Sequence, residues 1–468
     1  MEIKSQEESI SNSDQSYNSS SIALVLTACI ISILLIYMIY TRNIVFGSEM
    51  GHWVYPYFQG VPVLPLGITG IIILLVGLQI FLGSRFIHTF EEITLTVCFI
   101  NAVVIQSLML KIYPYTLGEL IQSDSSNSFL TPATQYSAYD ILSKYIELAP
   151  SFPLHAGSNL PGKILLFELF KIITSSTEVM GYLVIILSSL GALLLYGICK
   201  QLFKDRQIAF YALTLYVLIP SKLVFFPVLN TVTPVFILLF FLLFLVYLDK
   251  KQVWIPWMLG VVLYILIMFE PTPMTIGILL IAFLVQAIRN KRITAKDLWR
   301  LITHSVLAFS IIYGFFFVFY SFDLLRSFMF VLKDAVGFNT VREREYMIWF
   351  YENIKEFFIG SGIPIAIIVI YMAAQMFSQW MNPEKHPHWS TENVYLIGLI
   401  ATLGVVVVLG INRGEVTRLW IYLAVLVQIP AAFFLARIKK HDLLFLLVVG
   451  TLIFQNIITL HRVGFVIP

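Results

Sequence analysis

The segment HAGSNLPGK, residues 155–163, combines residue types that can bind a phosphate group. Pro161 suits the first turn of a helix, because the N–H group that proline lacks would have no partner there. The N–H groups that follow it, together with the ammonium group of Lys163, would then receive a phosphate oxygen. His155 and Asn159 stand in the same segment and are candidates for positioning a substrate. The alternative is a plain helix start, with Lys163 extended towards water.

A second motif, NRGEVTRLWIYL, covers residues 412–423 and places charged groups at the start of an apolar stretch. Ionisable side chains at such a place are costly unless they face water, a partner or a ligand. Arg413 and Arg418 are therefore candidate phosphate ligands, because a guanidinium group donates two parallel hydrogen bonds to an oxyanion. Glu415 would orient them. The alternative is an internal pair between Glu415 and an arginine that closes a tight loop.

The composition places both motifs in a membrane protein. Of the 468 residues, 59% are hydrophobic and only 12% are charged, which is more apolar chain than a soluble core requires. The net charge of +3 is spread thinly, and no tract is typical of nucleic-acid binding. The three cysteines fall in apolar stretches, so the sequence predicts neither a disulfide framework nor a metal cluster.

A spanning helix needs about 20 apolar residues. Windows of that size predict an all-α polytopic membrane protein with about thirteen transmembrane helices. The polar residues 1–20 are predicted to be a disordered cytoplasmic tail, and residues 21–468 to be a single transmembrane domain. The predicted spans lie near 22–40, 62–83, 93–110, 177–199, 207–220, 231–248, 254–270, 272–288, 301–320, 357–378, 394–411, 419–436 and 442–460.

The basic run RNKRITAKDLWR, residues 289–300, predicts the orientation, because Lys and Arg are retained on the cytoplasmic side. Counting outward from it puts the N-terminus inside and the C-terminus outside. The inside loops then carry 15 Lys and Arg, and the short outside loops carry 5. Residues 161–174 are apolar but too short to span, so we expect them to lie in the outer interface. If this stretch crosses the membrane, the predicted orientation of every segment before it is reversed.

The unusual polar features collect on the predicted outer side, chiefly in the segments 41–61, 111–176 and 321–356. Two stretches within them, 134–149 and 322–338, carry apolar residues on one face at helical spacing. We predict that both are helices lying along the membrane surface. The active site is therefore expected at the outer face of the cell membrane.

This combination of features resembles the GT-C glycosyltransferase superfamily, which includes the protein O-mannosyltransferases and the lipid A aminoarabinose transferases. Many bacterial members carry His-x-x-x-His-Pro-Pro-Gly or His-Pro-Pro-Leu-Gly-Lys. The matching positions here, 155–163, keep the first histidine and the Pro-Gly-Lys but lack the second histidine and the first proline. A Gly-Glu-x-x-Arg-aromatic turn opens a late helix in many members; Gly414, Glu415 and Arg418 match it here, and the aromatic residue, Trp420, follows one position later.

The resemblance implies an integral-membrane glycosyltransferase that takes a sugar from a polyprenyl-phosphate donor. The acceptor would be a glycan, a lipid or a protein, and membrane lipids would surround the enzyme. Some relatives require a divalent cation, Mg²⁺ or Mn²⁺, although no ligand cluster in this sequence demands one. Arg413, Arg418 and Lys163 would hold the donor phosphate, and His155, Asn159 and Glu415 would position the reacting groups.

The resemblance also implies a carboxylate base in an early outside loop, which would deprotonate the acceptor. The candidates are Asp140, Asp124 and Glu49. Each has an ordinary alternative: Asp140 has Lys144 four residues on as a helix partner, Asp124 lies in a turn-like run, and Glu49 stands in an aromatic loop that suits the membrane interface.

Two further residues are candidate substrate contacts. PSKLVFFPVLN resembles a family segment that often ends in Asp, and here the position is Asn230, which can hydrogen-bond a substrate but cannot act as a base. Glu270 in FEPTP ends a predicted span at a proline-rich break.

A transporter or lipid flippase would instead show charges in the middle of its spans and internal repeats. The sequence has few mid-span charges and no convincing repeat. A polysaccharide polymerase or ligase stays open.

Overall fold

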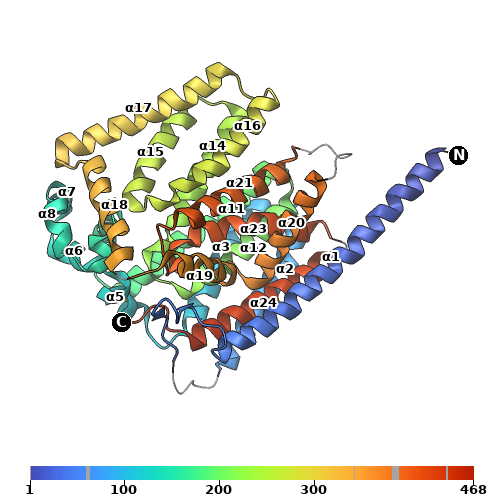
Figure 1. Ribbon diagram of the computed structural model, residues 1–468, viewed down its shortest axis with the longest axis horizontal. Helices are drawn as coiled ribbons and strands as arrows, with labels where there is room; N and C mark the ends of the chain where they lie inside the picture. Colours follow the sequence, from blue (N-terminus) through green and yellow to red (C-terminus); the bar gives the residue numbers. More distant parts are fainter. Residues whose placement is uncertain (1, 59–63, 342, 382–388, 439–440) are drawn as a thin grey trace.

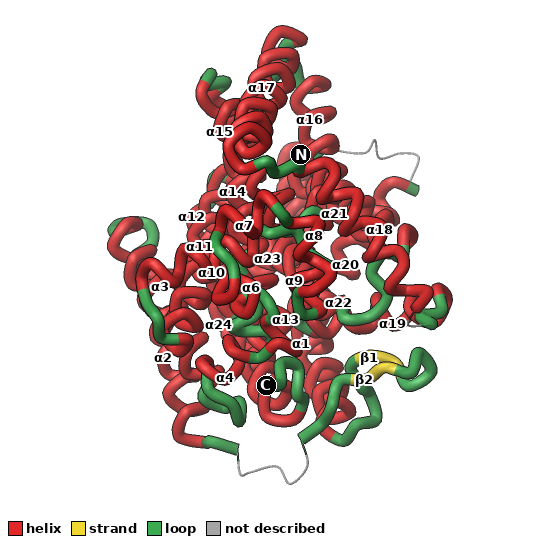
Figure 2. Tube along the Cα trace, turned by 90° about the vertical axis from the view of Figure 1, so that its left-hand side faces the viewer, coloured by secondary structure: helices red, strands yellow, loops and turns green. Residues whose placement is uncertain are grey.

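The computed structural model describes residues 2–58, 64–341, 343–381, 389–438 and 441–468. These residues form helices and loops, with one antiparallel pair of two-residue strands, β1 (Gly47–Ser48) and β2 (Trp53–Val54). Figure 2 shows this hairpin at the margin of a helical body. The prediction of an all-α fold is confirmed.

The protein is a multi-pass integral membrane protein: in the described ranges, 11 helical stretches are long and apolar enough to cross a bilayer. They are Ser19–Tyr40 within α1 (Glu2–Tyr40), α2 (Leu66–Phe86), α3 (Glu91–Leu110), α11 (Thr177–Phe203), Arg206–Val224 with α12 (Arg206–Val217) and α13 (Pro220–Val224), Leu229–Lys250 with α14 (Thr233–Lys250), Thr272–Arg289 with α16 (Gly277–Arg289), α17 (Ala295–Tyr320), α20 (Ile363–Trp380), α21 (Thr391–Leu409) and α24 (His441–Arg462).

Two of the predicted spans are shorter apolar helices of 16 residues each, α15 (Trp254–Phe269) and α23 (Ile421–Ala436). The prolines at 271 and 273 follow α15 directly and remove backbone donors that a longer helix would need. α23 is buried almost throughout and packs against α12, α20 and α21. A helix that is apolar on every side belongs at the centre of a bundle.

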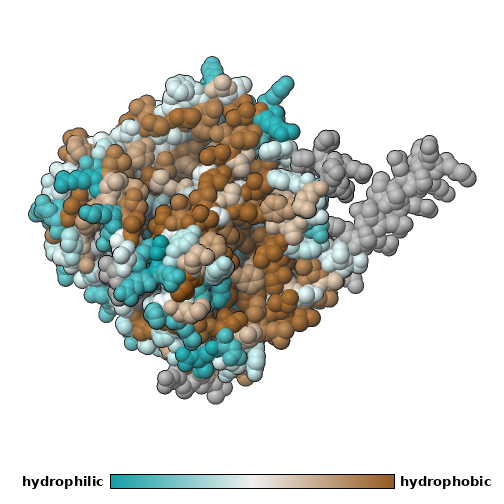
Figure 3. Space-filling model, in the orientation of Figure 1, coloured by the Kyte–Doolittle hydropathy of each residue, from teal (hydrophilic) through white to brown (hydrophobic). Residues whose placement is uncertain are grey.

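The outer helices expose apolar side chains, as a bilayer requires. α17 is the least covered, with only 11% of its most apolar window buried, and it lies at the edge of the molecule (Figure 1). Apolar residues form a broad band across the face in Figure 3, with hydrophilic residues along its left and lower margins. Residues 2–20, predicted to be a disordered tail, are the start of α1 and project from the body (Figure 1). They continue a helix that the apolar span nucleates.

The loops predicted to be cytoplasmic meet at one end of the bundle. Lys200 pairs with Glu91 at 2.5 Å, and Asp249 pairs with Lys204 at 3.8 Å and with Arg292 at 3.3 Å. Four loops that the counting rule assigned to one side are thus joined by ion pairs. Which side of the bilayer this end faces stays a prediction.

The opposite end carries short helices and turns. Residues 111–176 form α4 (Leu117–Gln122), α5 (Asp124–Asn127), α6 (Leu130–Gln135), α7 (Ala138–Ser143), α8 (Tyr145–Leu148), α9 (Leu154–Gly157) and α10 (Gly162–Ile173). The prediction of one helix over 134–149 is wrong. Tyr136 is extended, Ser137 caps α7 through the N–H of Asp140, and Lys144 leaves the helical conformation, so the stretch is split into α6, α7 and α8.

α10 matches the stretch expected to lie in the interface. Its 12 residues span about 18 Å, less than the roughly 30 Å of a hydrocarbon core. The face with Lys163, Ile164, Phe167 and Phe170 is buried, and the helix packs against α6 and α15. At the same end, α18 (Leu324–Val341) replaces the predicted helix 322–338, and α19 (Tyr346–Gly360) follows it.

Candidate functional site

The candidate site is built on the turn between α21 and α22 (Val416–Leu419). Gly414 and Glu415 both have left-handed backbones, with φ of +86° and +57°, so the chain reverses sharply before α22 begins. A Cβ atom at position 414 would lie 2.9 Å from the ring of Trp349. Glycine is therefore required there for its conformation and for its size. The turn places Glu415 and Arg418 three residues apart on one side of the loop.

Two buried side chains of α19 hold this turn. The carboxamide oxygen of Asn353 accepts the N–H of Gly414 at 3.1 Å. Glu356 accepts the N–H of Thr417 at 3.1 Å and the N–H of Gly47 at 2.8 Å. Burial raises the pKa of Glu356. One helix thus joins the β1–β2 hairpin to the 412–418 motif, although some 370 residues separate them in the chain.

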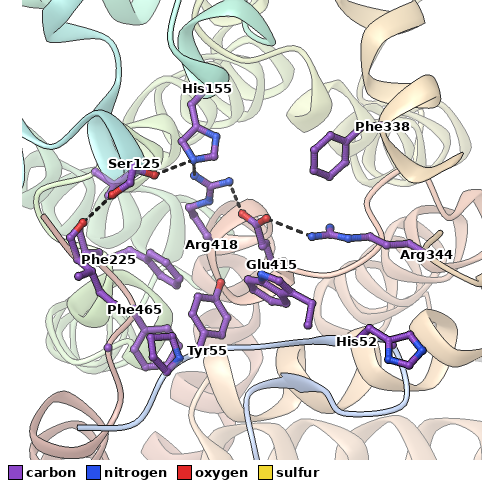
Figure 4. Close-up of a pocket in the computed structure, with 17 residues that line it drawn as sticks. His52, Tyr55, Ser125, His155, Phe225, Phe338, Arg344, Glu415, Arg418 and Phe465 are labelled. Carbon is purple, nitrogen blue, oxygen red and sulfur yellow. Dashed lines mark hydrogen bonds and ion pairs between the residues drawn. The ribbon is translucent and has the colours of Figure 1, made fainter. Parts of the chain in front are cut away.

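A row of charged groups lies on this support (Figure 4). Glu415 pairs with Arg418 at 2.5 Å through one carboxylate oxygen and with Arg344 at 3.4 Å through the other. On the far side of Arg418, the Nε2 atom of His155 lies 3.3 Å from Nη1. The same Nε2 atom lies 3.2 Å from the carbonyl oxygen of Ser125. Nε2 can donate to that carbonyl only when it carries a proton, and it can accept from Arg418 only when it does not. Each tautomer of the neutral ring therefore makes only one of these two hydrogen bonds.

The row borders two hollows. The larger has a volume of about 460 Å³ and the smaller about 130 Å³, and both are lined by His155, Phe338, Arg344, Glu415 and Arg418. The larger hollow adds residues of the hairpin, the turn after α13 and the C-terminal segment, among them His52, Trp53, Tyr55, Phe225 and Phe465. The smaller adds polar residues, among them Asn159, Asp334, Asn339 and Asn412.

The larger hollow draws on segments that the sequence assigned separately to the outer side: 41–61, 111–176, the PSKLVFFPVLN segment, 321–356 and the late arginine motif. All of them therefore share one end of the bundle. Tyr55, Phe225 and Phe465 pack against one another, with ring centroids 4.7–6.0 Å apart, and form an aromatic floor. The lining thus combines two guanidinium groups, one carboxylate and aromatic rings.

The charges of the row are set by burial and by one another. Burial, with the positive charge of Arg418 second, lowers the pKa of His155 to about 3, so its imidazole is neutral near pH 7. Burial opposes ionisation of Glu415, but Arg418 leads a set of positive neighbours that hold its pKa below the usual value. Two guanidinium groups and one carboxylate leave one net positive charge, which favours an anionic ligand.

Arg413 supports the row without joining it. Its Nη1 atom donates to the carbonyl oxygen of Arg344 at 2.7 Å, and its Nε atom donates to that of Gly410 at 3.2 Å. Arg344 in turn donates to the carbonyl oxygen of Arg413. The guanidinium group of Arg413 also lies over the ring of Tyr346, 5.4 Å from its centroid. These contacts fix the position of Arg344.

Four other predicted substrate residues lie together, and one of them, Asn159, lines the smaller hollow. Lys163 pairs with Glu270 at 3.1 Å, and their side chains are only 1% and 5% exposed. Glu270 also accepts from Asn230 at 3.0 Å and from Thr233 at 2.6 Å, and the Oδ1 atom of Asn159 lies 3.5 Å from the Lys163 ammonium group. Burial lowers the pKa of Lys163, and Glu270 opposes that effect. Lys163 was expected to bind the donor phosphate, but its ammonium group is buried and its charge is already neutralised by Glu270.

The three candidate bases lie apart from one another. Asp140 is partly exposed on α7, pairs with Lys144 at 3.1 Å, and has its pKa lowered chiefly by a hydrogen bond from Ser137. Asp124 is exposed on α5, directly before the pocket residue Ser125. Glu49 is exposed in the turn between β1 and β2. None of the three is among the described residues that line either hollow.

Sequence reasoning did not single out Arg344, Tyr55 or Asp334. Arg344 stands in the charged run VREREY directly before α19, and that run was the only signal. Tyr55 is 6% exposed, and its buried hydroxyl has no hydrogen-bond partner among the described residues. Asp334 lies one helical turn before Phe338 in a stretch that was predicted to be a helix.

The lining does not fit a divalent cation. Among the described residues no group of three or more His, Cys, Asp or Glu side chains gathers, and Glu415 is held between two arginines. Hard cations need several oxygen ligands, whereas the positive groups of this row would repel a cation.

Neither the protein-family models nor the curated proteins compared with this sequence gave a match.

Proposed function

We propose that the protein is an integral-membrane glycosyltransferase that moves a sugar from a polyprenyl-phosphate donor to an acceptor at the outer membrane face. The observation that carries this proposal is the row Arg344–Glu415–Arg418, which leaves one net positive charge in a pocket at the end of a membrane bundle. A lipid-linked phosphate brings a negative headgroup to that depth. Its apolar tail would remain among the exposed apolar helices.

Arg418 is the residue that we assign to the donor phosphate. Its Nε atom is buried and has no hydrogen-bond partner among the described residues, and leaving such a donor unpaired costs about 1–3 kcal/mol. A phosphate oxygen would satisfy it. Guanidinium and phosphate groups match in geometry and form paired, charge-assisted hydrogen bonds. Arg344, held in place by Arg413, would supply the second positive charge.

The aromatic floor supports a sugar as the group transferred. Ligand pockets are commonly lined by aromatic side chains with a few polar groups that set orientation, and the larger hollow has this composition. In the reaction an acceptor hydroxyl oxygen bonds to the anomeric carbon, and the bond from that carbon to the phosphate oxygen breaks. The electron pair leaves with the polyprenyl phosphate, whose charge the two arginines stabilise.

The buried cluster of Lys163 and Glu270 would support this site from behind. Asn159, one turn before Lys163 in sequence, lines the smaller hollow, so the cluster links α10 and α15 to the pocket wall. We assign Lys163, Glu270 and Asn230 to positioning, and His155 to contact with the ligand, because its ring lines both hollows.

The test is transfer of radiolabelled sugar from synthetic polyprenyl-phosphate hexoses and pentoses to a membrane extract, with the purified protein in nanodiscs. Arg418→Ala should lower transfer by about 10²–10³-fold, the cost of removing one preorganised stabilising donor. Arg437→Ala is the matched control, because Arg437 directly follows α23, lines neither hollow and contacts the ring of Phe433. Full activity in Arg418→Ala would refute the proposal. Transfer only from lipid-linked oligosaccharides would favour a glycan ligase.

A further inference from the structure

The smaller hollow has the lining of a site for hydroxyl groups. Asn159, Asn339 and Asn412 contribute carboxamides, and Ser158 contributes a hydroxyl group. Such groups donate and accept hydrogen bonds without a net charge, and they can therefore bind the hydroxyl groups of a polyol. The larger hollow, with its aromatic floor, shares Arg344, Glu415 and Arg418 with the smaller one. Two chemically different compartments therefore share one row of charges.

One face of α18 forms a wall of the smaller hollow. Asp334, Ala335, Phe338 and Asn339 all line it. The second pair follows the first by three to five residues, which places the two pairs on the same side of a helix. Asn339 anchors this face, since its Nδ2 atom donates to the carbonyl oxygen of Ile411 at 2.8 Å. The anchor lies directly beside the 412–418 motif. The hydrogen bond of Asn339 thus fixes the part of α18 that places Asp334 at the hollow.

Asp334 differs from the other carboxylate at the hollow. Glu415 is engaged by two arginines at 2.5 and 3.4 Å, and a carboxylate held in this way is a weak proton acceptor. Asp334 has no hydrogen bond or ion pair with any described residue, and it remains exposed. The carboxylates Asp124, Asp140 and Glu49 line neither hollow.

We infer that Asp334 is the general base of the transfer and that the smaller hollow binds the reacting hydroxyl group of the acceptor, a carbohydrate or another polyol. This inference rests on the proposed glycosyltransferase function. The acceptor O–H proton passes to a carboxylate oxygen of Asp334 as the acceptor oxygen bonds to the anomeric carbon. The donor phosphate leaves on the opposite side of that carbon, towards the larger hollow, which is the arrangement of an inverting transfer.

The experiment compares donor binding with sugar transfer. Asp334→Asn keeps the shape of the side chain but cannot accept the proton, so kcat should fall by about 10²–10⁴-fold. The Kd of a fluorescent polyprenyl phosphate should stay within about twofold, which shows that the fold is intact. Asp334→Glu should restore part of kcat. The other charged or titratable groups at the hollow are His155, Arg344, Arg413, Glu415 and Arg418, with Tyr145 close to Asp334.

Lys333→Gln is the matched control, because it changes the charge of the same helical turn but lines neither hollow. It should leave kcat within about twofold of the wild type. Transfer by Asp334→Asn within threefold of the wild type would overturn the inference, as would loss of transfer in Asp124→Asn while Asp334→Asn stays active. A wild-type protein that neither binds polyprenyl phosphate nor transfers sugar would instead refute the proposed function itself.

Discussion

Replacing Glu270 with Gln would leave Lys163 as an unpaired charge in the interior. The two side chains are 3.1 Å apart and almost completely buried. Two unit charges at that distance attract by about 5 kcal/mol at an effective dielectric constant of about 20, and removing one partner of a buried pair typically costs about 3–5 kcal/mol. Glutamine retains an oxygen that can accept from Asn230 and Thr233, so the main loss is the charge.

A second estimate of the free energy lost in Glu270→Gln gives the same upper value. An unpaired buried lysine can lose its proton, at a cost of about 1.4 kcal/mol for each pH unit below its unfolded pKa of about 10.4. At pH 7 this amounts to about 5 kcal/mol. Burial already lowers the pKa of Lys163, and loss of Glu270 removes the main group that opposes this. We therefore expect Glu270→Gln to lower the free energy of unfolding by about 3–5 kcal/mol at pH 7.

The pH dependence has a definite sign. With a depressed folded-state pKa, Lys163 binds fewer protons in the folded state than in the unfolded state, so stability rises with pH up to about 10. The difference in unfolding free energy between the wild type and Glu270→Gln should decrease by about 2–3 kcal/mol between pH 7 and pH 9. Unfolding by SDS titration in mixed micelles, followed by circular dichroism, measures both quantities. The control is Lys163→Met combined with Glu270→Gln, which has no unpaired charge and should recover most of the loss. A deficit below about 1 kcal/mol, or one that does not change with pH, would refute this reasoning.

Three further predictions concern the site. Gly414→Ala should destabilise the protein by about 1–3 kcal/mol, because the backbone has φ +86° and an aromatic ring lies 2.9 Å from the new Cβ atom; Gly404→Ala, in open space, should be nearly neutral in the same unfolding assay. Glu356→Ala should release the β1–β2 hairpin, so that the Gly47 amide exchanges its hydrogen at least tenfold faster by mass spectrometry, and an unchanged rate would contradict the hydrogen bond at 2.8 Å. His155 has a folded-state pKa of about 3, below its unfolded value, so the stability that it contributes is complete above about pH 6.5 and is lost at about 1.4 kcal/mol per pH unit as the pH falls towards 4. His155→Gln should remove that slope from the unfolding free energy measured between pH 4 and 7.

The membrane helices were predictable because each depends on local chain alone. A backbone in a bilayer must satisfy its own hydrogen bonds, so an apolar window of sufficient length becomes a helix whatever its neighbours do. All thirteen predicted windows contain a helix, and 11 of the helical stretches are long enough to span. The stretch 134–149 failed the same reasoning. Its periodicity was helical, but the local cap at Ser137 divides it into short pieces.

The site was only partly predictable. Arg418, Glu415 and His155 were singled out because charged or polar groups at the edge of an apolar stretch need a reason to be there, and the structure brings them to one pocket. The ion pair between Lys163 and Glu270 joins residues 107 positions apart, and Arg344 reaches Glu415 across 71 positions. No spacing rule relates such residues, because helix packing decides which side chains meet.

The sequence by itself determined the helical class, the candidate spans and which residues were too polar for their surroundings, since these follow from backbone hydrogen bonding and from the cost of placing charge in an apolar medium. Only the tertiary structure decided which of those polar residues neutralise one another and which are left facing a cavity. Lys163 is enclosed with a carboxylate, whereas the Nε donor of Arg418, beside the pocket, has no partner among the residues that the structure describes. The two differ because a charge acquires its partner from the element packed against it, and that element lies far away in the chain.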